Sequence, residues 1–369
     1  MTNDLFSPTS LGSLVLPNRM VMAPMSRSRA MEGGIPSQLM VEHYGHRSTA
    51  GLIISESAPV SQQAVGYPNT PGIFTPQQTA GWLRVMNSVR SRGGRMFVQL
   101  QHCGRISHPT HQDGGALPVA PSAVHPDGFA FTASGYKEFE TPRQLETSEI
   151  ADVVDQFRHA AKNAQDAGFD GVEVHGANGY LIDQFLRDGT NRRTDGYGGN
   201  VEKRVRFLQE ILDAVLTVFP AERVGLKLSP ENSFNDMSDS DPQVNFEKIV
   251  AAIADRALGY LHVTEASMDT GGHIAGSPRS VDYHRLRALF PGTYIANNGY
   301  SKDRAETAIQ VGHADLVAFG APFLANPDLV RRFRDGLPLN TIDKSTFYLG
   351  GEVGYNDYPF ASADLLSAA

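Results

Sequence analysis

The stretch from Gly171 to Tyr180 reads GVEVHGANGY and joins a short apolar strand to a glycine-rich loop. Its valines alternate with Glu173 and His175, which gives the strand one apolar and one polar face. Short runs rich in Val, Ile and Leu recur on both sides of this stretch, and most precede a segment with helical periodicity. We expect eight strands, at residues 19–23, 52–56, 95–100, 171–175, 224–229, 260–264, 294–297 and 316–319.

Helical segments follow most of these strands. Between residues 150 and 164 apolar side chains recur at i, i+3, i+4 and i+7, and Thr147 or Ser148 is available as the N-cap. Residues 201–218 and 246–258 have the same periodicity. These segments are long enough to cover the strands from outside.

The last unit and the order of the elements complete the fold prediction. Asn326 followed by Pro327 predicts the N-cap and first turn of a helix that continues to Arg334. Eight strand–helix units with short, doubly covered strands predict a (β/α)₈ TIM barrel. The main alternative is a doubly wound open sheet, which usually has a glycine-rich turn after its first strand, and residues 23–26 read APMS there. We expect one domain over residues 1–369.

A long segment between the third and fourth strands does not fit a plain strand–helix unit. Residues 104–147 contain five prolines and several glycines, and they lack helical periodicity. A long insertion after a barrel strand normally covers the active-site face. We therefore expect residues 104–147 to form a capping loop or hairpin over that face, within the single domain.

Composition and charge exclude several classes of protein. The 369 residues include 32 Lys and Arg against 40 Asp and Glu, a formal net charge of −8, which argues against nucleic-acid binding. The apolar runs are too short to cross a membrane, and we expect no signal peptide because the first residues lack its basic and apolar regions. Cys103 is the only cysteine, which excludes an internal disulfide and a cysteine-bound iron–sulfur cluster and predicts a cytoplasmic location.

Polar side chains lie near the C-terminal ends of the predicted strands, opposite their apolar faces. In a barrel these side chains point into the lumen, at the end where barrels build active sites. Burying them is costly unless they are paired or bind a ligand. One interpretation is a hydrogen-bonded layer with a Glu173–Lys227 ion pair; for the whole set, a binding site is favoured. The set is Gln99, Glu173, His175, Lys227, His262 and Thr264.

The loop at residues 175–180 carries an imidazole, a carboxamide and a phenol. His175 and Asn178 are neutral N–H donors that can converge on one carbonyl oxygen, and the Tyr180 phenol is a weak acid with a pKa of about 10. Such a set suits reduction of a carbonyl-activated double bond, because two donors stabilise enolate charge while the phenol protonates the adjacent carbon. The alternative is a helix-entry loop in which Asn178 and the glycines form a turn and Tyr180 only packs.

Phosphate, rather than a metal, is the ligand that the remaining motifs indicate. Asn298 and Gly299 follow the seventh strand, and Gly320 and Ala321 follow the eighth. Barrels often bind phosphate on these two loops through backbone N–H groups. The histidines at 102, 108, 111 and 125, together with Cys103, match no structural zinc spacing, so we expect no metal.

Distinctive motifs occur along the whole chain: LVLPNRMVMAPM (14–25), GLIISE (51–56), VQL (98–100), GRISH (104–108), NRRTDGYGG (191–199), FG (319–320), NPDL (326–329) and GYNDYP (354–359). In these motifs the sequence resembles the Old Yellow Enzyme family of FMN-dependent ene-reductases, near the N-ethylmaleimide reductase group. The resemblance implies a TIM barrel that holds FMN and works by a ping-pong cycle. NADPH or NADH is the reductant, and the substrate is an α,β-unsaturated carbonyl, imide or nitroalkene.

The resemblance also implies roles by position. His175 and Asn178 would bind the substrate's electron-withdrawing oxygen, Tyr180 would deliver the proton, and Tyr67 and Tyr355 would flank the pocket. The residues implied around FMN are Pro24, Met25, Ser26 and Ser57 or Ala58 at the flavin ring, Gln99 at its pyrimidine edge, Lys227 near N1 and O2, and Asn298, Gly299, Gly320 and Ala321 at the phosphate.

The chain departs from the family at four positions. Lys227 and Ala321 stand where arginine is usual, Gln101 where tryptophan is frequent, and Ser26 where threonine is commoner. Lysine keeps the charge without the planar fork, and alanine removes a charged contact to phosphate. Two other functions stay open: a non-redox barrel lyase or isomerase using Lys227 or His175, and a flavin-binding protein with little turnover. We expect a monomer or homodimer acting on a small electrophilic alkene.

Overall fold

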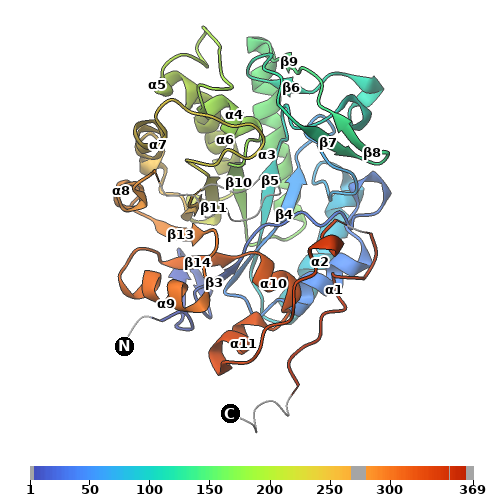
Figure 1. Ribbon diagram of the computed structural model, residues 1–369, viewed down its shortest axis with the longest axis vertical. Coiled ribbons are helices and arrows are strands. Elements are labelled where there is room, and N and C mark those ends of the chain that lie inside the picture. Colours follow the sequence, from blue (N-terminus) through green and yellow to red (C-terminus); the bar gives the residue numbers. More distant parts are fainter. Residues whose placement is uncertain (1–3, 267–279, 349, 363–369) are drawn as a thin grey trace.

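Eight parallel strands in the described part of the chain close into a barrel (Figure 1). The computed structural model describes residues 4–266, 280–348 and 350–362. The last strand pairs with the first, with Val317 opposite Met20, and this pairing closes the barrel. The predicted TIM barrel is confirmed, and every predicted strand overlaps an observed one. The strands are β3 Met20–Met22, β4 Leu52–Pro59, β5 Met96–Gln101, β10 Gly171–Gly176, β11 Val224–Leu228, β12 Tyr260–Thr264, β13 Thr293–Asn297 and β14 Leu316–Phe319.

Helices surround the barrel in Figure 1 and follow the strands in sequence. The apolar face of the helix after β5 is buried at Val153, Phe157 and Ala161, as its periodicity predicts. The helices are α1 Gln38–His46, α2 Pro76–Ser91, α3 Ile150–Asp166, α4 Leu181–Leu186, α5 Val201–Arg204, α6 Arg206–Leu216, α7 Pro242–Ala251, α8 Tyr283–Leu289, α9 Lys302–Gln310, α10 Ala321–Ala325 and α11 Leu329–Asp335.

The start of α3 differs from the prediction. Thr147 and Ser148 lie in a short 3₁₀ turn and do not cap the helix. The capping pair belongs to that turn: the Glu146 side chain accepts from the backbone of Glu149 while the Glu149 side chain accepts from the backbone of Glu146, and α3 follows at Ile150 without a side-chain cap of its own. This reciprocal pair satisfies two backbone donors that a single hydroxyl cannot.

Two other predicted helices have different limits. The segment at 201–218 is divided into α5 and α6 at Val205. The segment at 246–258 starts earlier, at Pro242, because the Asp241 side chain accepts from the backbone N–H of Val244. It ends at Ala251, short of the predicted limit.

The predicted N-cap at Asn326 is wrong. Asn326 is the last residue of the turn that ends α10, and its Nδ2 donates to the carbonyl of Pro322 at 2.8 Å. The next helix, α11, begins only at Leu329. An asparagine before proline therefore ends one helix here instead of starting another.

An apolar cluster fills the barrel around the N-terminal halves of most strands. A hairpin of β1 (Thr9–Leu11) and β2 (Leu14–Leu16) contributes three leucines to it. The rings of Phe97 and Tyr260 fit because glycines face them: a Cβ at Gly225 would lie 2.1 Å from the Tyr260 ring. The polar side chains inside the barrel therefore lie at the C-terminal ends of the strands.

The insertion after β5 contains the predicted hairpin. Strands β7 (Phe129–Thr132) and β8 (Gly135–Glu138) pair antiparallel, and β6 (Val119–Ala120) pairs with β9 (Arg143–Gln144). Ala130 of the hairpin clusters with Ile106 and Phe139, and Tyr67 and Tyr180 pack against this cluster. The hairpin thus reaches the residues of the candidate site, whereas the assignment of 104–147 as a cap of one single domain stays a prediction.

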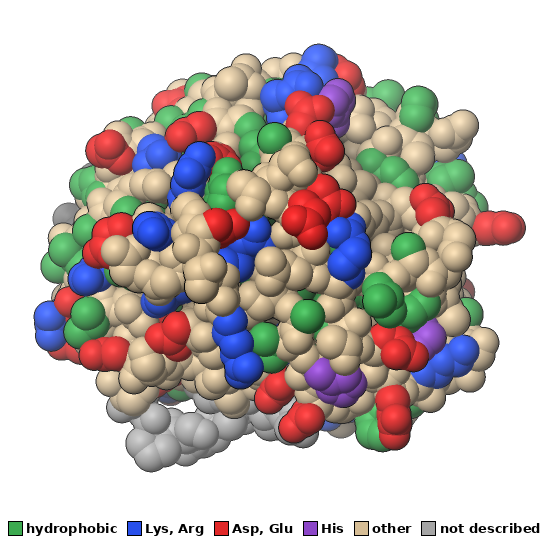
Figure 2. Space-filling view, turned by 90° about the horizontal axis from the view of Figure 1, so that it is seen from above, with side chains coloured by type: hydrophobic (Ala, Val, Ile, Leu, Met, Phe, Trp, Pro, Cys, Tyr) green, Lys and Arg blue, Asp and Glu red, His purple; other side chains and the backbone are tan. Residues whose placement is uncertain are grey.

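The outer surface has mixed charge. On the face shown in Figure 2, acidic and basic side chains are interspersed over the described residues. Among the helices that the structure describes, none has the length and apolarity needed to span a membrane.

Candidate active site

Strand register brings the predicted polar residues together inside the barrel. Glu173 lies beside Gln99, and His175 beside Lys227, which is itself next to His262. The Glu173 carboxylate accepts from Gln99 Nε2 at 2.7 Å and from His262 Nδ1 at 2.8 Å. In the alternative interpretation of a hydrogen-bonded layer, the partner of Glu173 is thus His262, and Lys227 acts on Glu173 through its charge.

Burial and charge set the protonation of this group. For Glu173, burial acts to raise the pKa, but His262, Lys227 and Gln99 outweigh it, so the pKa is lowered and the group is a carboxylate. Burial lowers the pKa of His262, which leaves a neutral ring that donates to Glu173. Burial lowers the pKa of Lys227 to about 8, although Glu173 opposes the shift.

Several buried polar atoms at this end of the barrel have no protein partner among the described residues. They are His175 Nδ1, His262 Nε2 and Thr264 Oγ1. Unpaired buried groups of this kind cost about 1–3 kcal/mol each, so they indicate a ligand. A polar heterocycle next to the Lys227 ammonium would supply partners of the right chemistry, as the pyrimidine edge of a flavin does.

The loops implied at the flavin ring and phosphate also meet. Gly320 directly precedes α10, and a Cβ there would lie 3.3 Å from Met25 Sδ, so the loops after β14 and β3 touch. Asn298 and Gly299 have φ of 97° and 73°, and the Asn298 side chain donates to the carbonyl of Glu265 at 2.6 Å. Ala321 is exposed and offers no charge. A phosphate in this place would bind backbone N–H groups.

The remaining residues implied at the flavin ring lie on the same side of the barrel. Pro24 and Ser26 flank Met25 and are half-buried, as is Met25. Ser57 and Ala58 are buried on β4, where Ser57 pairs with Gln99 beyond a bulge in the strand.

Tyr180 and His175 are neutral hydrogen-bond donors in this environment. The Tyr180 hydroxyl lies 3.0 Å from the hydroxyl of Tyr67, and the rings of His175 and Tyr180 are 5.2 Å apart. Burial raises the pKa of Tyr180, so the phenol keeps its proton at neutral pH. Burial lowers the pKa of His175 well below its usual value, and Lys227 and His262 add to the shift.

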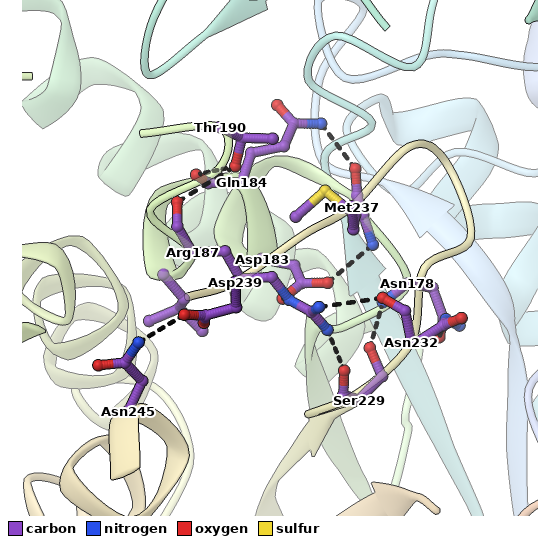
Figure 3. A network of polar contacts seen from close by, with 12 residues as sticks. Asn178, Asp183, Gln184, Arg187, Thr190, Ser229, Asn232, Met237, Asp239 and Asn245 are labelled. Atoms are coloured by element: carbon purple, nitrogen blue, oxygen red, sulfur yellow. Dashed lines mark hydrogen bonds and ion pairs between the residues drawn. The ribbon is translucent and has the colours of Figure 1, made fainter. Parts of the chain in front are cut away.

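Asn178 is held on several sides by the loop after β11 (Figure 3). Its φ of 60° lies in the left-handed region, which asparagine tolerates better than most residues. Its backbone N–H donates to Ser229 Oγ at 2.8 Å, and its carbonyl accepts from Asn235 Nδ2 at 2.8 Å. Its side-chain Oδ1 accepts from Asn232 Nδ2 at 3.0 Å. Sequence reasoning missed these partners, because only the fold brings the two loops together.

Tyr355 is the predicted pocket residue that the structure places elsewhere. Its ring is fully buried and stacks on His43 of α1, with centroids 3.9 Å apart. The guanidinium groups of Arg27 and Arg29 lie 5.1 Å and 5.0 Å from the ring centroid. Tyr348, which the sequence did not single out, is close enough to Tyr180 to affect its pKa.

Most of the chain is similar to proteins of one known family. Residues 4–340 match the model of the NADH:flavin oxidoreductase / NADH oxidase family. The chain belongs to this family. It is 41% identical to 12-oxophytodienoate reductase 7 of Oryza sativa subsp. japonica, over 96% of this chain and 94% of that protein. It is 42% identical to a probable flavin mononucleotide-dependent alkene reductase of Leishmania infantum, over 96% and 97%. The structure of morphinone reductase superposes with a TM-score of 0.93 at 44% identity, covering 99% of this chain and 98% of that one.

These findings confirm the resemblance to the Old Yellow Enzyme family. The prediction of a flavin oxidoreductase that uses FMN and NAD(P)H to reduce alkenes is confirmed with it. The non-redox lyase or isomerase loses its support, because the whole barrel matches flavin oxidoreductases.

Proposed function

We propose that the loop at residues 175–180 is the substrate site of an ene-reductase for small electrophilic alkenes. His175 and Asn178 bind the carbonyl, imide or nitro oxygen, and Tyr180 protonates the α-carbon. The observation that carries this proposal is the set of neutral donors beside a protonated phenol at the C-terminal end of the barrel. The expectation of a monomer or homodimer without nucleic-acid partners is part of the same proposal.

FMN, when bound, supplies a two-electron centre that accepts hydride from NADPH or NADH and passes it to the β-carbon of the alkene. Gln99 and Lys227 would hold its pyrimidine edge, with Pro24, Met25, Ser26 and Ser57 or Ala58 along the ring. The backbone of Asn298, Gly299, Gly320 and Ala321 would hold its phosphate.

The chain's own groups then act on the substrate. As hydride reaches the β-carbon, negative charge develops on the oxygen, and N–H donors at His175 and Asn178 stabilise it; removal of one such donor costs about 10²–10³ in rate. Tyr180 gives its proton to the α-carbon and regains one from solvent. Tyr67 contacts the Tyr180 hydroxyl and keeps it in place.

The test is anaerobic stopped-flow spectroscopy of the purified holoenzyme. We expect a flavin band that NADPH or NADH bleaches and 2-cyclohexenone restores. In Tyr180→Phe, bleaching should keep its rate, while reoxidation by this weakly activated enone should slow about 10²-fold or more, because the general acid is lost.

Tyr67→Phe is the matched control, since it removes a neighbouring hydroxyl and leaves the Tyr180 phenol. Its reoxidation should slow much less. Equal reoxidation rates for wild type and Tyr180→Phe would remove Tyr180 from the proton-donor role, and a flavin that NAD(P)H fails to bleach would favour a flavin-binding protein without turnover.

A further inference from the structure

The carboxamide of Asn178 must present its N–H₂ end to act as a donor toward substrate. An amide can rotate by half a turn and present its oxygen instead, at little steric cost. The structure therefore needs a group that fixes which end faces the substrate, and the loop after β11 contains one.

We propose that Asn232 is a positioning residue that sets the orientation of the Asn178 amide. Its Nδ2 donates to Asn178 Oδ1 at 3.0 Å, which turns the N–H₂ group of Asn178 away from Asn232. Asn232 itself has only 1% of its surface exposed. This inference rests on the proposed role of Asn178 in binding the substrate oxygen.

A backbone N–H determines which of the two amides donates in the Asn232–Asn178 hydrogen bond. The N–H of Phe234 donates to Asn232 Oδ1 at 3.0 Å, and a backbone N–H has no acceptor form. Asn232 must therefore place its oxygen toward Phe234 and its N–H₂ toward Asn178. Asn178 must in turn present its oxygen to Asn232. Its N–H₂ group is then left to donate to the substrate.

A buried ion pair holds Asn232 in position (Figure 3). Arg187 Nε lies 2.9 Å from Asp183 Oδ1, with both side chains buried, and Arg187 also donates to the carbonyls of Asn232, at 3.0 Å, and Ser229. The other Asp183 oxygen accepts from the N–H of Gly179 at 2.8 Å. The same pair thus fixes the loop of Asn178 and the loop of Asn232 relative to each other.

The decisive variant is Asn232→Asp, which is nearly isosteric. The introduced carboxylate still accepts from Phe234, but it has no donor for Asn178 Oδ1 and attracts the N–H₂ group of Asn178 to itself. We expect reoxidation of the reduced holoenzyme by 2-cyclohexenone to slow about 100-fold, as when a whole oxyanion donor is removed. Asn232→Ser keeps an acceptor for Phe234 without reaching Asn178 and should slow reoxidation about tenfold. It also keeps the test valid if Asn232→Asp does not fold.

A double-mutant cycle separates positioning from general damage to the fold. In an Asn178→Ala background neither Asn232 substitution should slow reoxidation further, because no amide remains to orient. Asn245→Ala is the matched control: it removes an asparagine donor to Asp239 on a neighbouring element and should leave the rate unchanged.

Each outcome decides between the two proposals. If Asn178→Ala is slow but Asn232→Asp equals wild type, the positioning role is overturned and the proposed function stands. The positioning role also fails if the Asn232 effects persist in the Asn178→Ala background. A silent Asn178→Ala would overturn the substrate-binding role of Asn178, and this inference with it.

Discussion

His175, Tyr180 and Lys227 ionise in different ways, and burial pushes each of them toward its neutral form. The phenol must keep its proton to protonate substrate, and the neutral imidazole still has one N–H donor, so burial leaves both ready for the reaction. For Lys227 the neutral form lacks the charge that a flavin needs. Glu173 opposes the loss of this charge, and the pKa of Lys227 stays at about 8.

The pKa of Lys227 predicts pH-dependent flavin binding. The apoprotein lysine, with a pKa of about 8, is charged below that pH and neutral above it. Because the electron-rich pyrimidine edge favours the ammonium form, the Kd for FMN should rise above pH 8, by at most about tenfold per pH unit. The phosphate of FMN loses its second proton near pH 6 and does not contribute. Titration of apoprotein with FMN from pH 7 to 9.5, followed by flavin fluorescence, measures the effect.

Two substitutions give this measurement its controls. Lys227→Met should bind FMN more weakly than the wild type below pH 8, with a flat profile that the wild type approaches at high pH. Lys227→Arg keeps its charge throughout the range and should bind tightly with a flat profile. A flat wild-type profile would mean that Lys227 does not face the flavin.

Among the elements, β11 depends on a residue without a side chain. The barrel interior leaves no room at Gly225, where a Cβ would lie 2.1 Å from the Tyr260 ring. Gly225→Ala should therefore lower the free energy of unfolding by about 3 kcal/mol, the upper end of the usual range for overpacking. Urea denaturation followed by circular dichroism gives the value. Gly350→Ala, at an open position with an ordinary backbone, should be neutral, and equal stability of the two variants would contradict the packing argument.

Strands were easier to predict from the sequence than helix ends. Barrel strands are buried on both faces, so each is a short apolar run bounded by polar residues, and all eight were found. Helix starts depend on which side chain accepts from a free N–H, and before α3 Glu146 caps a 3₁₀ turn that contains Thr147 and Ser148, the expected caps. The site residues likewise differ in how far the sequence alone could predict them. His175, Asn178 and Tyr180 share one loop and were visible in the sequence, whereas Asn232 acts across a loop–loop contact that no local pattern records.

At the scale of the whole molecule, the C-terminal segment is tied to the loop after β3. Arg29 donates to the carbonyls of Phe347 at 2.6 Å, Thr346 at 2.8 Å and Val353 at 3.1 Å. Arg27, one residue beyond Ser26, donates to the carbonyls of Phe347 and Gly354. The residues implied at the flavin ring are therefore anchored by a segment more than 300 positions away.

This anchoring predicts the effect of Arg29→Ala. Loss of the guanidinium leaves the buried carbonyl of Thr346 without its Arg29 donor, at about 1–3 kcal/mol, and removes the contacts to Phe347 and Val353, so the segments at 346–348 and 350–354 should open more often. Limited proteolysis with mass spectrometry should show cleavage there at least about tenfold faster, while the far-ultraviolet circular dichroism of the barrel stays the same. Arg29→Lys should be intermediate, because an ammonium reaches fewer carbonyls. Cleavage at the wild-type rate in Arg29→Ala would show that the segment is held by other contacts.

The pairing of β14 with β3 also has a consequence for biosynthesis. Val317 and Met20 are adjacent in the barrel, but the ribosome synthesises Met20 early and Val317 late. At about 5–20 residues per second, the ribosome needs roughly 15–60 s to produce the partner of the first barrel strand. Throughout that interval the leucines of the β1–β2 hairpin have no closed lumen to enter. The nascent chain is therefore expected to be a client of holdase chaperones, and flavin uptake to follow release from the ribosome.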